Sequence, residues 1–440
     1  MTSCPAPELV GAGLTVPLVT GDAVPYANFD YAASAPALAA VQNAVHDLLP
    51  WYASVHRGAG LPSQTCTQAY EEARAAVARF VGARRGTATI FTRNTTDAMN
   101  LLAHALPPST TVVVFETEHH ATLLPWRGRR VVRLPAPSSP EAACAAVAQA
   151  LADSPVGPRL VAVTGASNVT GECWPVAELA RVAHAAGARI VVDAAQLAPH
   201  HPVDMAELDV DYLALSGHKL YAPFGVGALI GRADWLRAAP PYLVGGGATR
   251  NVNDTSVSWA ELPDRHEAGT PNVVGAVALA AACGALRRAD RYAAAARETA
   301  LLARLRRGLG TVPGLRELAL WDEDAPRVGI TSFTLDGWDG RWLATALSAE
   351  YGIGVRAGSF CAHPFVRRLT GVGAGCTGDA PVPVRASIGL GTTEEDVDRL
   401  VAAVDQLARR GAAWSYVDRN GEVVPNPDPR PRKSISETWF

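Results

Sequence analysis

The sequence predicts an α/β fold in which helices cover both faces of a mostly parallel sheet, followed by a smaller α+β domain. The first observation is that short apolar runs alternate with stretches of helical periodicity from about residue 26 to residue 290. This alternation is typical of sheets that are buried on both faces. The second observation is that the pattern becomes mixed after residue 290, and a chain of 440 residues has room for two or three domains.

The expected strands of the first domain are six short apolar runs. They cover residues 88–91, 111–115, 159–164, 189–193, 210–215 and 226–230. Stretches with helical spacing lie between them, at residues 95–106, 141–151 and 176–186.

Four parts of the chain are expected: an N-terminal arm at 1–25, a large domain at 26–290, a small domain at 291–411 and a Pro-rich tail at 412–440. The small domain has predicted helices at 292–309, 340–351 and 394–409, and predicted strands at 330–335, near Val355 and at 384–388. The alternating prolines from Pro425 to Pro431 predict an extended tail.

The composition excludes several classes of partner. The formal net charge is −3, which gives no electrostatic footprint for nucleic acid or an anionic membrane. The longest nearly uncharged apolar run, residues 273–286, is too short to cross a bilayer. The segment before Asp22 lacks the basic residues of a signal peptide, and seven scattered cysteines without a C-x-x-C pair predict free thiols in a reducing compartment. We therefore expect a cytoplasmic protein that binds neither nucleic acid nor membrane.

Lysine is almost absent from the chain. Only Lys219 and Lys433 occur, so 37 of the 39 basic residues are arginine. Arginine forms no imine and keeps its proton, whereas lysine can form an imine and can lose its proton. Lys219 follows an apolar run, which makes it a candidate for chemistry, and chance survival in an arginine-biased sequence is the alternative.

Two groups that suit one cofactor come at the ends of expected strands. Asp193 ends the strand at 189–193, and Lys219 follows the strand at 210–215. Ligands of open α/β sheets bind at the carboxyl ends of the strands, so both side chains are expected at one edge. Pyridoxal phosphate requires a lysine for its aldehyde and a carboxylate that keeps its ring nitrogen protonated. A turn or capping role is the alternative for Asp193.

A phosphate site is expected where residues 92–97 join a strand to the next helix. Thr95 and Thr96 place hydroxyl and N–H groups at the start of that helix, which is a ready anion site. Ser216 and His218, on either side of the lysine loop, add donors. Ordinary helix capping is the alternative reading of the threonines.

Histidines provide a further candidate. His119 follows the strand at 111–115, where it could stack on a cofactor ring and carry a proton near pH 7. His120 and the pair His200 and His201 resemble metal ligands at first sight. The sequence has no H-E-x-x-H motif and no supporting carboxylate spacing, so no metal site is expected. P-loop, dinucleotide-binding and G-x-S-x-G motifs do not occur either.

Nine short motifs follow one another between about Phe29 and Leu407. They are Phe-Asp-Tyr-Ala-Ala-Ser-Ala (29–35), Val-His-Arg-Gly (55–58), Glu-His-His-Ala (118–121), Ser-Asn-Val-Thr-Gly (167–171), Val-Asp-Ala-Ala-Gln (192–196), Ser-Gly-His-Lys-Leu-Tyr (216–221), Glu-Ala-Gly-Thr-Pro-Asn (267–272), Val-Arg-Ala-Gly-Ser-Phe-Cys-Ala (355–362) and Val-Arg-Ala-Ser (384–387). In this order they resemble the class V aminotransferase superfamily of fold-type I pyridoxal-phosphate enzymes. Within it they are most similar to the group II cysteine desulfurases and selenocysteine lyases. The resemblance implies a mostly parallel sheet of the seven-stranded type.

The resemblance also implies cofactor roles. Lys219 would be the Schiff-base lysine, and Asp193 would pair with the ring nitrogen. His119 would stack on the ring, and Gln196 would contact the ring hydroxyl. The phosphate would be held by Thr95, Thr96, Ser216 and His218, and by Thr270 from the neighbouring subunit of a homodimer.

Substrate roles follow in the same way. Arg385 with Asn168 would bind the α-carboxylate of an amino acid, and Arg356 would bind near the substrate and order the loop that carries Cys361. His56 is also assigned to the substrate site. Cys361 would attack the sulfur of L-cysteine, release L-alanine and keep the sulfur as a persulfide for an acceptor protein. A buried structural cysteine is the alternative.

The sequence departs from the family pattern near this cysteine. Ser359 and Phe360 stand where the group usually has two histidines, and Gly165 stands where a histidine is common. The segment 370–383 is longer and richer in Gly than the family pattern predicts. It contains Cys376, which is a candidate for sulfur relay; a loop residue without a role in the chemistry is the alternative. These departures affect the substrate and the acceptor more than the cofactor.

Three functions therefore compete. The favoured one is a cysteine desulfurase. The second is a related class V enzyme, such as a selenocysteine lyase, a C–S lyase on a cysteine conjugate, or an aminotransferase or epimerase of a specialised pathway. The third is a cofactor-binding or sulfur-relay protein without turnover, against which the combination of Lys219, Asp193, His119 and Arg385 argues.

Overall fold

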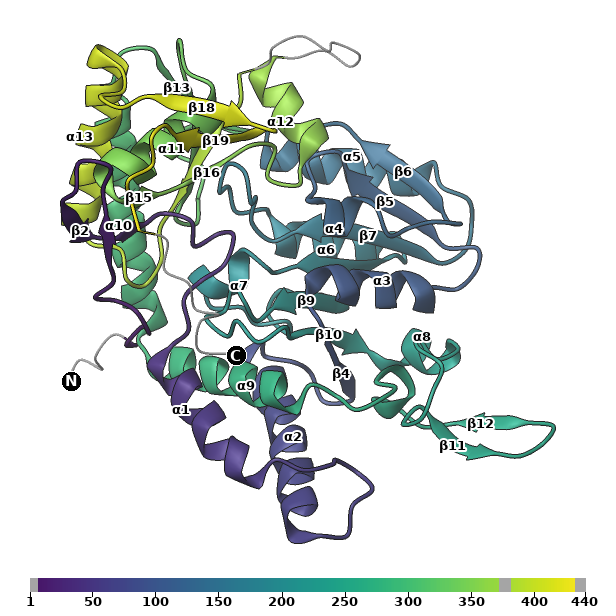
Figure 1. The fold of residues 1–440 in the computed structure, drawn as a ribbon. Coiled ribbons are helices and arrows are strands. Elements are labelled where there is room, and N and C mark those ends of the chain that lie inside the picture. Colours follow the sequence, from purple (N-terminus) through teal and green to yellow (C-terminus); the bar gives the residue numbers. More distant parts are fainter. Residues whose placement is uncertain (1–6, 372–380, 432–440) are drawn as a thin grey trace.

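The computed structural model describes residues 7–371 and 381–431, and its largest element is a seven-stranded sheet (Figure 1). The strands lie in the order β4, β10, β9, β8, β7, β5 and β6. Their bounds are β4 Thr87–Thr92, β5 Thr111–Phe115, β6 Arg130–Leu134, β7 Arg159–Thr164, β8 Arg189–Asp193, β9 Tyr212–Ser216 and β10 Gly227–Arg232. β10 is antiparallel to both neighbours, and the other pairs are parallel. The predicted α/β fold with a mostly parallel sheet is confirmed.

Strand β6 is the one member of this sheet that the six apolar runs do not include. Arg130 and Arg133 interrupt its apolar residues, and it pairs only with β5 at the edge of the sheet. An edge strand has one free side, so charged residues are tolerated there and the apolar signal becomes weak.

Helices cover both faces of the sheet, as the alternation of strand residues requires. Val112 and Val114 of β5 belong to one buried cluster, and Val113 and Phe115 belong to the other. The first cluster is covered by α3 Thr95–Ala105, α4 His120–Leu123 and α8 Ala233–Ala238. The second is covered by α1 Ala39–Leu48, α2 Leu61–Phe80, α5 Pro140–Ala152, α6 Val176–Ala185, α7 Leu197–His200 and α9 Val273–Arg288. Because successive strand side chains point to opposite faces, each strand contributes to both clusters.

The C-terminal part of the chain builds a second, antiparallel sheet in the order β13, β14, β17 and β16. Its elements are β13 Leu315–Leu318, β14 Ile330–Leu335, β16 Arg356–Ala357, β17 Val384–Ser387, α10 Arg291–Leu309, α11 Gly340–Tyr351 and α13 Glu394–Arg410. Ala27 and Phe29 pack into the same core, and β3 Ala27–Asn28 pairs in parallel with β15 Ile353–Gly354. The chain segment around Ala27–Phe29 thus packs with the second sheet. The four-part division of the chain stays a prediction.

Short elements decorate both parts. Hairpin β11 Thr249–Val252 and β12 Val257–Trp259 projects from the large sheet (Figure 1). The remaining short elements are β1 Thr15–Pro17, β2 Ala23–Pro25, η1 Leu49–Trp51, η2 Asp264–His266 and α12 His363–Thr370. Helix α12 begins at the end of the loop that carries Cys361; Pro364 lies in its first turn, and Gly371, whose φ of 77° suits glycine, follows its last residue. Among the described residues, no helix combines the length and the apolar character that a membrane span needs.

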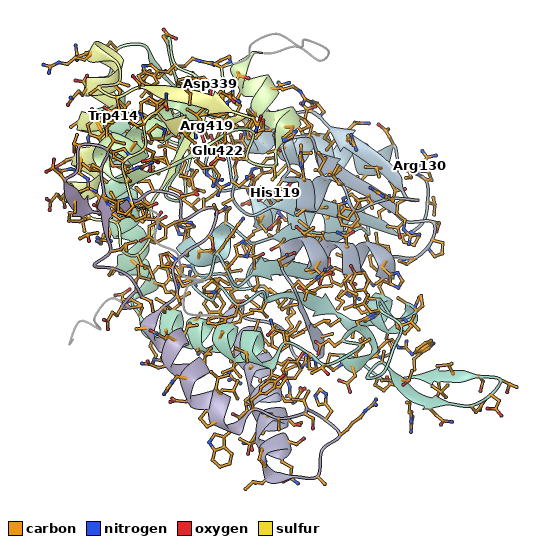
Figure 2. The ribbon with its side chains drawn as sticks, in the orientation of Figure 1. His119, Arg130, Asp339, Trp414, Arg419 and Glu422 are labelled. Carbon is orange, nitrogen blue, oxygen red and sulfur yellow. The ribbon has the colours of Figure 1, made fainter. Side chains whose placement is uncertain are left out.

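The segment after α13 differs from the expected extended tail. It forms a hairpin of β18 Tyr416–Arg419 and β19 Glu422–Pro425 (Figure 2 labels Arg419 and Glu422). The Glu350 carboxylate of α11 accepts hydrogen bonds from the backbone N–H groups of Ala413 and Trp414 and from the Tyr416 hydroxyl. One acidic side chain thus fixes the start of the hairpin, a long-range contact that the proline pattern does not encode.

A buried ion pair links the two parts. The Arg327 guanidinium lies 3.0 Å from the Glu172 carboxylate, and their side chains are 2% and 0% exposed. Glu172 also accepts from the Leu320 backbone N–H, and Arg327 donates to the Thr170 carbonyl. The pair therefore joins the loop after β7 to the chain segment that leads into β14.

We expect Arg327→Met to lower the free energy of unfolding by about 3–5 kcal/mol, because it leaves the Glu172 carboxylate buried without its cation. Urea denaturation followed by circular dichroism measures the change. The double variant Glu172→Gln/Arg327→Met removes both charges and should recover much of the loss. A single variant as stable as the wild type would contradict this account of the pair.

Candidate active site

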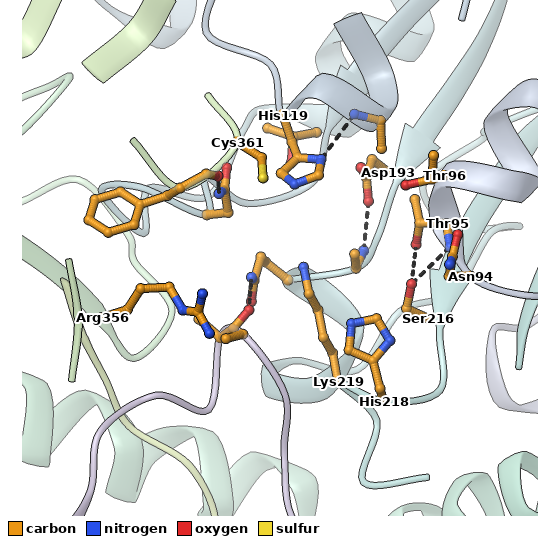
Figure 3. A pocket seen from close by; sticks show the side chains of 18 of the residues that line it. Asn94, Thr95, Thr96, His119, Asp193, Ser216, His218, Lys219, Arg356 and Cys361 are labelled. Carbon is orange, nitrogen blue, oxygen red and sulfur yellow. Dashed lines mark hydrogen bonds between the residues drawn. The ribbon is translucent and has the colours of Figure 1, made fainter. Parts of the chain in front are cut away.

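A cavity of about 290 Å³ lies at the carboxyl edge of the large sheet, where β16 and β17 of the second sheet meet it; Figure 3 shows side chains that line it. The structure brings twelve of the predicted site residues together in its wall: Thr95, Thr96, His119, Asn168, Asp193, Gln196, Ser216, His218, Lys219, Arg356, Cys361 and Arg385. They come from segments up to about 290 residues apart because the strand ends and β16–β17 meet here. His56 and Thr270 are not among them.

Lys219 lies directly after β9, in the wall of the cavity. Its ammonium group makes no hydrogen bond or ion pair with any residue that the structure describes. Removal from bulk solvent, together with the charge of Arg385, lowers the pKa of Lys219 to about 8, against the raising effect of Asp193. A lysine with this pKa supplies a neutral amine near physiological pH, which attack on an aldehyde requires.

Asp193 is the last residue of β8 and is buried. One carboxylate oxygen accepts from the Thr122 hydroxyl at 2.9 Å, and the other accepts from the Ala195 backbone N–H at 2.9 Å. Burial raises the pKa of Asp193, and the nearby charge of Lys219 opposes that rise. The carboxylate is therefore fixed in direction and sheltered from water, which suits a partner for a protonated ring nitrogen.

The start of α3 forms the opposite end of the cavity. Asn94 caps the helix by accepting from the Asp97 N–H at 3.0 Å. The Ser216 hydroxyl lies 2.8 Å from the Thr95 hydroxyl and accepts from the Thr95 N–H. Burial and the charge of Lys219 lower the pKa of His218 to about 4, so its ring is neutral at pH 7. Hydroxyls, a helix N-terminus and Lys219 together make this end of the cavity receptive to an anion.

His119 lies between the large sheet and the small domain (Figure 2). Its Nδ1 accepts from the Ala121 N–H at 3.0 Å, so a neutral ring carries its proton on Nε2. Burial, with the charges of Lys219 and Arg385, lowers the pKa of His119 to about 3. The ring therefore stays neutral at pH 7, which suits stacking and differs from the expected titration near neutrality.

Gln196 follows β8 and contributes a buried amide. Its Nε2 donates to the Ala32 carbonyl at 2.8 Å, whereas its Oε1 has no hydrogen-bond partner among the described residues. A buried acceptor without a donor is costly and points to a missing one, such as a hydroxyl group of a ligand.

Arg385 is held in place by Asn168 and by Asp30, and Asp30 is not among the site residues that the sequence predicts. Its guanidinium, 3% exposed, donates to the Asn168 carbonyl at 2.9 Å and to the Asp30 carboxylate at 3.3 Å. The exposed Arg356 contacts the same carboxylate at 3.1 Å. Burial lowers the pKa of Arg385 to about 10, and Asp30 opposes this effect. Asp30 lies in the first of the nine motifs, which is the only sequence signal that could have found it.

Cys361 lies at the mouth of the cavity, next to His119 in the view of Figure 3. The residue is exposed, so the alternative of a buried structural cysteine is wrong. Phe360 and Cys361 have positive φ angles of 48° and 54°, an unusual conformation for bulky residues. The turn is fixed by hydrogen bonds from the Asn168 side-chain amide to the Phe360 carbonyl at 2.7 Å and from the His120 N–H to the Cys361 carbonyl at 2.8 Å. Cys376 lies outside the described residues.

His56 and Thr270 line a different cavity of about 600 Å³, together with Gly246, Gly247 and Arg250. Both residues are exposed, and His56 pairs with Glu71 at 3.1 Å. One chain on its own therefore does not bring these two residues to Lys219.

Two of the histidines that resemble metal ligands in the sequence have structural partners. His200 pairs with Glu298 at 2.7 Å, and His120 packs edge-on against His363 with ring centroids 4.7 Å apart. Within residues 7–371 and 381–431, no three His, Cys, Asp or Glu side chains are grouped so that they could hold a metal ion.

Comparison with known proteins identifies the family. Residues 27–400 match the model of the family described as Aminotransferase class-V. The chain belongs to the class-V aminotransferase family. A cysteine desulfurase of Dickeya dadantii is 38% identical over 398 residues, which cover 88% of this chain and 92% of that protein. Cysteine desulfurase CsdA of Escherichia coli is 36% identical over 371 residues, covering 80% and 86%.

Solved structures agree with this assignment. The crystal structure of the Escherichia coli cysteine desulfurase CsdA has a TM-score of 0.75 at 34% identity, over 87% of this chain and 94% of that chain. The apo cysteine desulfurase of Thermococcus onnurineus NA1 has a TM-score of 0.77 at 31% identity, over 87% and 95%. The family predicted from the nine motifs and its fold type are confirmed.

Enzymes of the class-V aminotransferase family depend on pyridoxal phosphate, and the cavity fits that cofactor. The unpartnered Oε1 of Gln196 can accept from its ring hydroxyl, and the amine of Lys219 is free to react with its aldehyde. The Asp193 carboxylate suits its ring nitrogen. The hydroxyls and N–H groups at the start of α3 suit its phosphate. When bound, the cofactor supplies an electron-accepting ring.

We expect the rate at which the apoprotein takes up pyridoxal phosphate to rise with pH and to level off above about pH 8, as Lys219 loses its proton. Asp193→Asn removes a charge that raises the pKa of Lys219, so the midpoint of the pH dependence should move to lower pH in this variant. Arg385→Met removes a charge that lowers this pKa, so its midpoint should move to higher pH. Stopped-flow absorbance measures the rates, and equal midpoints in all three proteins would contradict the assignment.

Proposed function

We propose that the protein is a pyridoxal-phosphate-dependent cysteine desulfurase that converts L-cysteine to L-alanine and keeps the sulfur as a persulfide on Cys361. The observation that carries the proposal is the exposed thiol of Cys361 at the mouth of a cavity that also contains Lys219 and the Arg385–Arg356 pair. Relatives with 36–38% identity over most of the chain are named cysteine desulfurases.

The substrate would be oriented by its carboxylate. Arg385 and Arg356 carry two positive charges against one on Asp30, which leaves the site with a net attraction for one carboxylate. The planar guanidinium of Arg385 suits a two-oxygen contact, and the backbone carbonyl of Asn168 accepts a hydrogen bond from it. With the carboxylate held here and the amino group toward Lys219, the side chain of L-cysteine has Cys361 as its neighbour at the mouth.

Lys219 and Cys361 would then divide the chemistry. Lys219, with a pKa of about 8, can take the proton from Cα of the substrate and return one to its β-carbon. The Cys361 thiolate attacks the substrate sulfur, so that an S–S bond forms and the C–S bond breaks. The electron pair of the broken bond stays with carbon, which is protonated to give the methyl group of L-alanine. His119, neutral at pH 7, fits a stacking role above the cofactor ring.

We expect the wild-type holoenzyme to release L-alanine and sulfide in equal, catalytic amounts from L-cysteine in the presence of a thiol reductant. Cys361→Ser should keep the visible absorption of the bound cofactor but lower alanine formation by about a hundredfold or more, as removal of a reacting group does. Lys219→Ala should lose both the absorption and the activity.

Quantitative amino-acid analysis and a sulfide assay measure these products. Cys173→Ser is a matched control, because this thiol lies away from the cavity and burial raises its pKa to about 12. If Cys361→Ser forms alanine at the wild-type rate, the thiol is not the nucleophile, and a different class-V reaction takes the place of the desulfurase.

We also propose that the enzyme is a homodimer in which Thr270 and His56 of one chain complete the site of the other. Support comes from their position in a cavity separate from Lys219. Large apolar side chains are exposed in the segments next to that cavity, which is typical of an interface: Leu49, Trp51, Tyr52, Leu61, Leu243 and Val244. A protein that accepts the sulfur and a cytoplasmic location stay predictions.

A mixed dimer tests this arrangement. We expect a Lys219→Ala homodimer to be inactive and a Thr270→Ala homodimer to be weakly active. A heterodimer of the two should recover about half of the wild-type activity, because one of its two sites has both residues. Differently tagged chains allow the heterodimer to be purified and assayed for alanine formation. If the heterodimer shows no recovery, Thr270 serves its own chain. If the Thr270→Ala homodimer is as active as the wild type, Thr270 has no role in the site.

A further inference from the structure

We propose that Phe360 couples recognition of the substrate carboxylate at Arg385 to the position of the Cys361 thiol. The inference deepens the proposed function, because it concerns how the same site would sense its substrate. Phe360 precedes Cys361 directly and is one of the departures from the family pattern. Its ring lines the cavity and is 8% exposed.

The ring of Phe360 contacts the guanidinium of Arg385. The central carbon of that guanidinium lies 5.0 Å from the ring centroid, a cation–π arrangement. Arg385 is 3% exposed and its Nε has no hydrogen-bond partner among the described residues, so the cation has little water to compensate its charge. A cation–π contact is strongest for such a desolvated cation. Phe360 therefore helps to fix the group that would bind the carboxylate.

The backbone of Phe360 is tied to the same place. Its carbonyl accepts from the Asn168 side-chain amide at 2.7 Å, while the Asn168 carbonyl accepts from Arg385 at 2.9 Å. Ring and carbonyl of Phe360 thus both contact groups that would meet the carboxylate. A shift of Arg385 when the carboxylate binds would therefore reach the turn that carries Cys361 through both the ring and the carbonyl of Phe360.

The turn leaves little room for independent movement of Cys361. Phe360 and Cys361 both have left-handed backbone conformations, which cost free energy and persist only when the surroundings impose them. On its other side, Phe360 packs in a small cluster with Val169, Phe365 and Val366, which attaches the turn to α12. Loss of the ring would relax both the guanidinium and the turn.

The test compares Phe360→Leu with Phe365→Leu in the holoenzyme. Phe365 belongs to the same apolar cluster and is fully buried, and the structure gives it no contact with Arg385 among the described residues, so it controls for loss of packing. Two probes are used: L-alanine, which has the carboxylate, and ethylamine, which lacks it. Binding is measured by the change in cofactor absorption, and Cys361 exposure by its alkylation rate with iodoacetamide, followed by mass spectrometry.

In the wild type, we expect L-alanine but not ethylamine to change the alkylation rate of Cys361. Phe360→Leu should weaken L-alanine binding by about three- to tenfold, leave ethylamine binding unchanged and abolish the effect of L-alanine on alkylation. Phe360→Tyr keeps the ring and should behave like the wild type, and Phe365→Leu should keep the wild-type response.

The proposal is overturned if Phe360→Leu keeps the wild-type affinity and alkylation response, if Phe365→Leu loses them equally, or if L-alanine does not change alkylation in the wild type. None of these readouts requires turnover of L-cysteine. An enzyme that releases no alanine from L-cysteine yet shows the ring-dependent response would refute the desulfurase and leave the coupling intact.

Discussion

The arrangement of the site depends on two groups of opposite charge, Asp193 and Lys219, that lie sheltered from water at one edge of the large sheet. Asp193 ends β8 and Lys219 follows the neighbouring parallel strand β9, so the fold itself brings a carboxylate and an amine to the same sheet edge. Burial shifts the pKa of each group toward its neutral form, and the charge of the other group opposes that shift. The low pKa values of His119 and His218 result first from burial and then from the charge of Lys219.

A second set of charges occupies the side of the cavity that the second sheet provides. Arg385 and Arg356 come from β17 and β16, and Asp30 follows β3, which also pairs with this part of the molecule. Asn168 connects this set to the large sheet through Arg385 and Phe360. The groups that suit the cofactor and the arginines proposed to bind a carboxylate thus come from different parts of the fold, and the Cys361 turn lies where they meet.

Sequence reasoning found the parts of the site that follow from strand ends and rare residue types. Asp193 and Lys219 were predicted because strands place them at one edge, and lysine is scarce enough for one residue to be conspicuous. Asp30 was not assigned, because its role depends on two arginines more than 300 residues away. The neutrality of His119 was also missed, since it results from burial and from neighbouring charges. In the fold, edge strand β6 and the hairpin of β18 and β19 are not predicted for a similar reason. Their stability comes from contacts with other segments and not from a local sequence pattern.

The pairing of β3 with β15 has a mechanical consequence. Because Asp30 is carried on the same small sheet region as Arg356 and Arg385, the three can travel as one unit. A hinge rotation of that unit would widen the cavity without breaking an ion pair inside it, whereas links to the large sheet, among them those through Asn168, the His120 backbone and the Glu172–Arg327 pair, would stretch. A new amino acid would then enter and the old one leave by rigid-body opening, and the groups on each side of the site would keep their arrangement between turnovers.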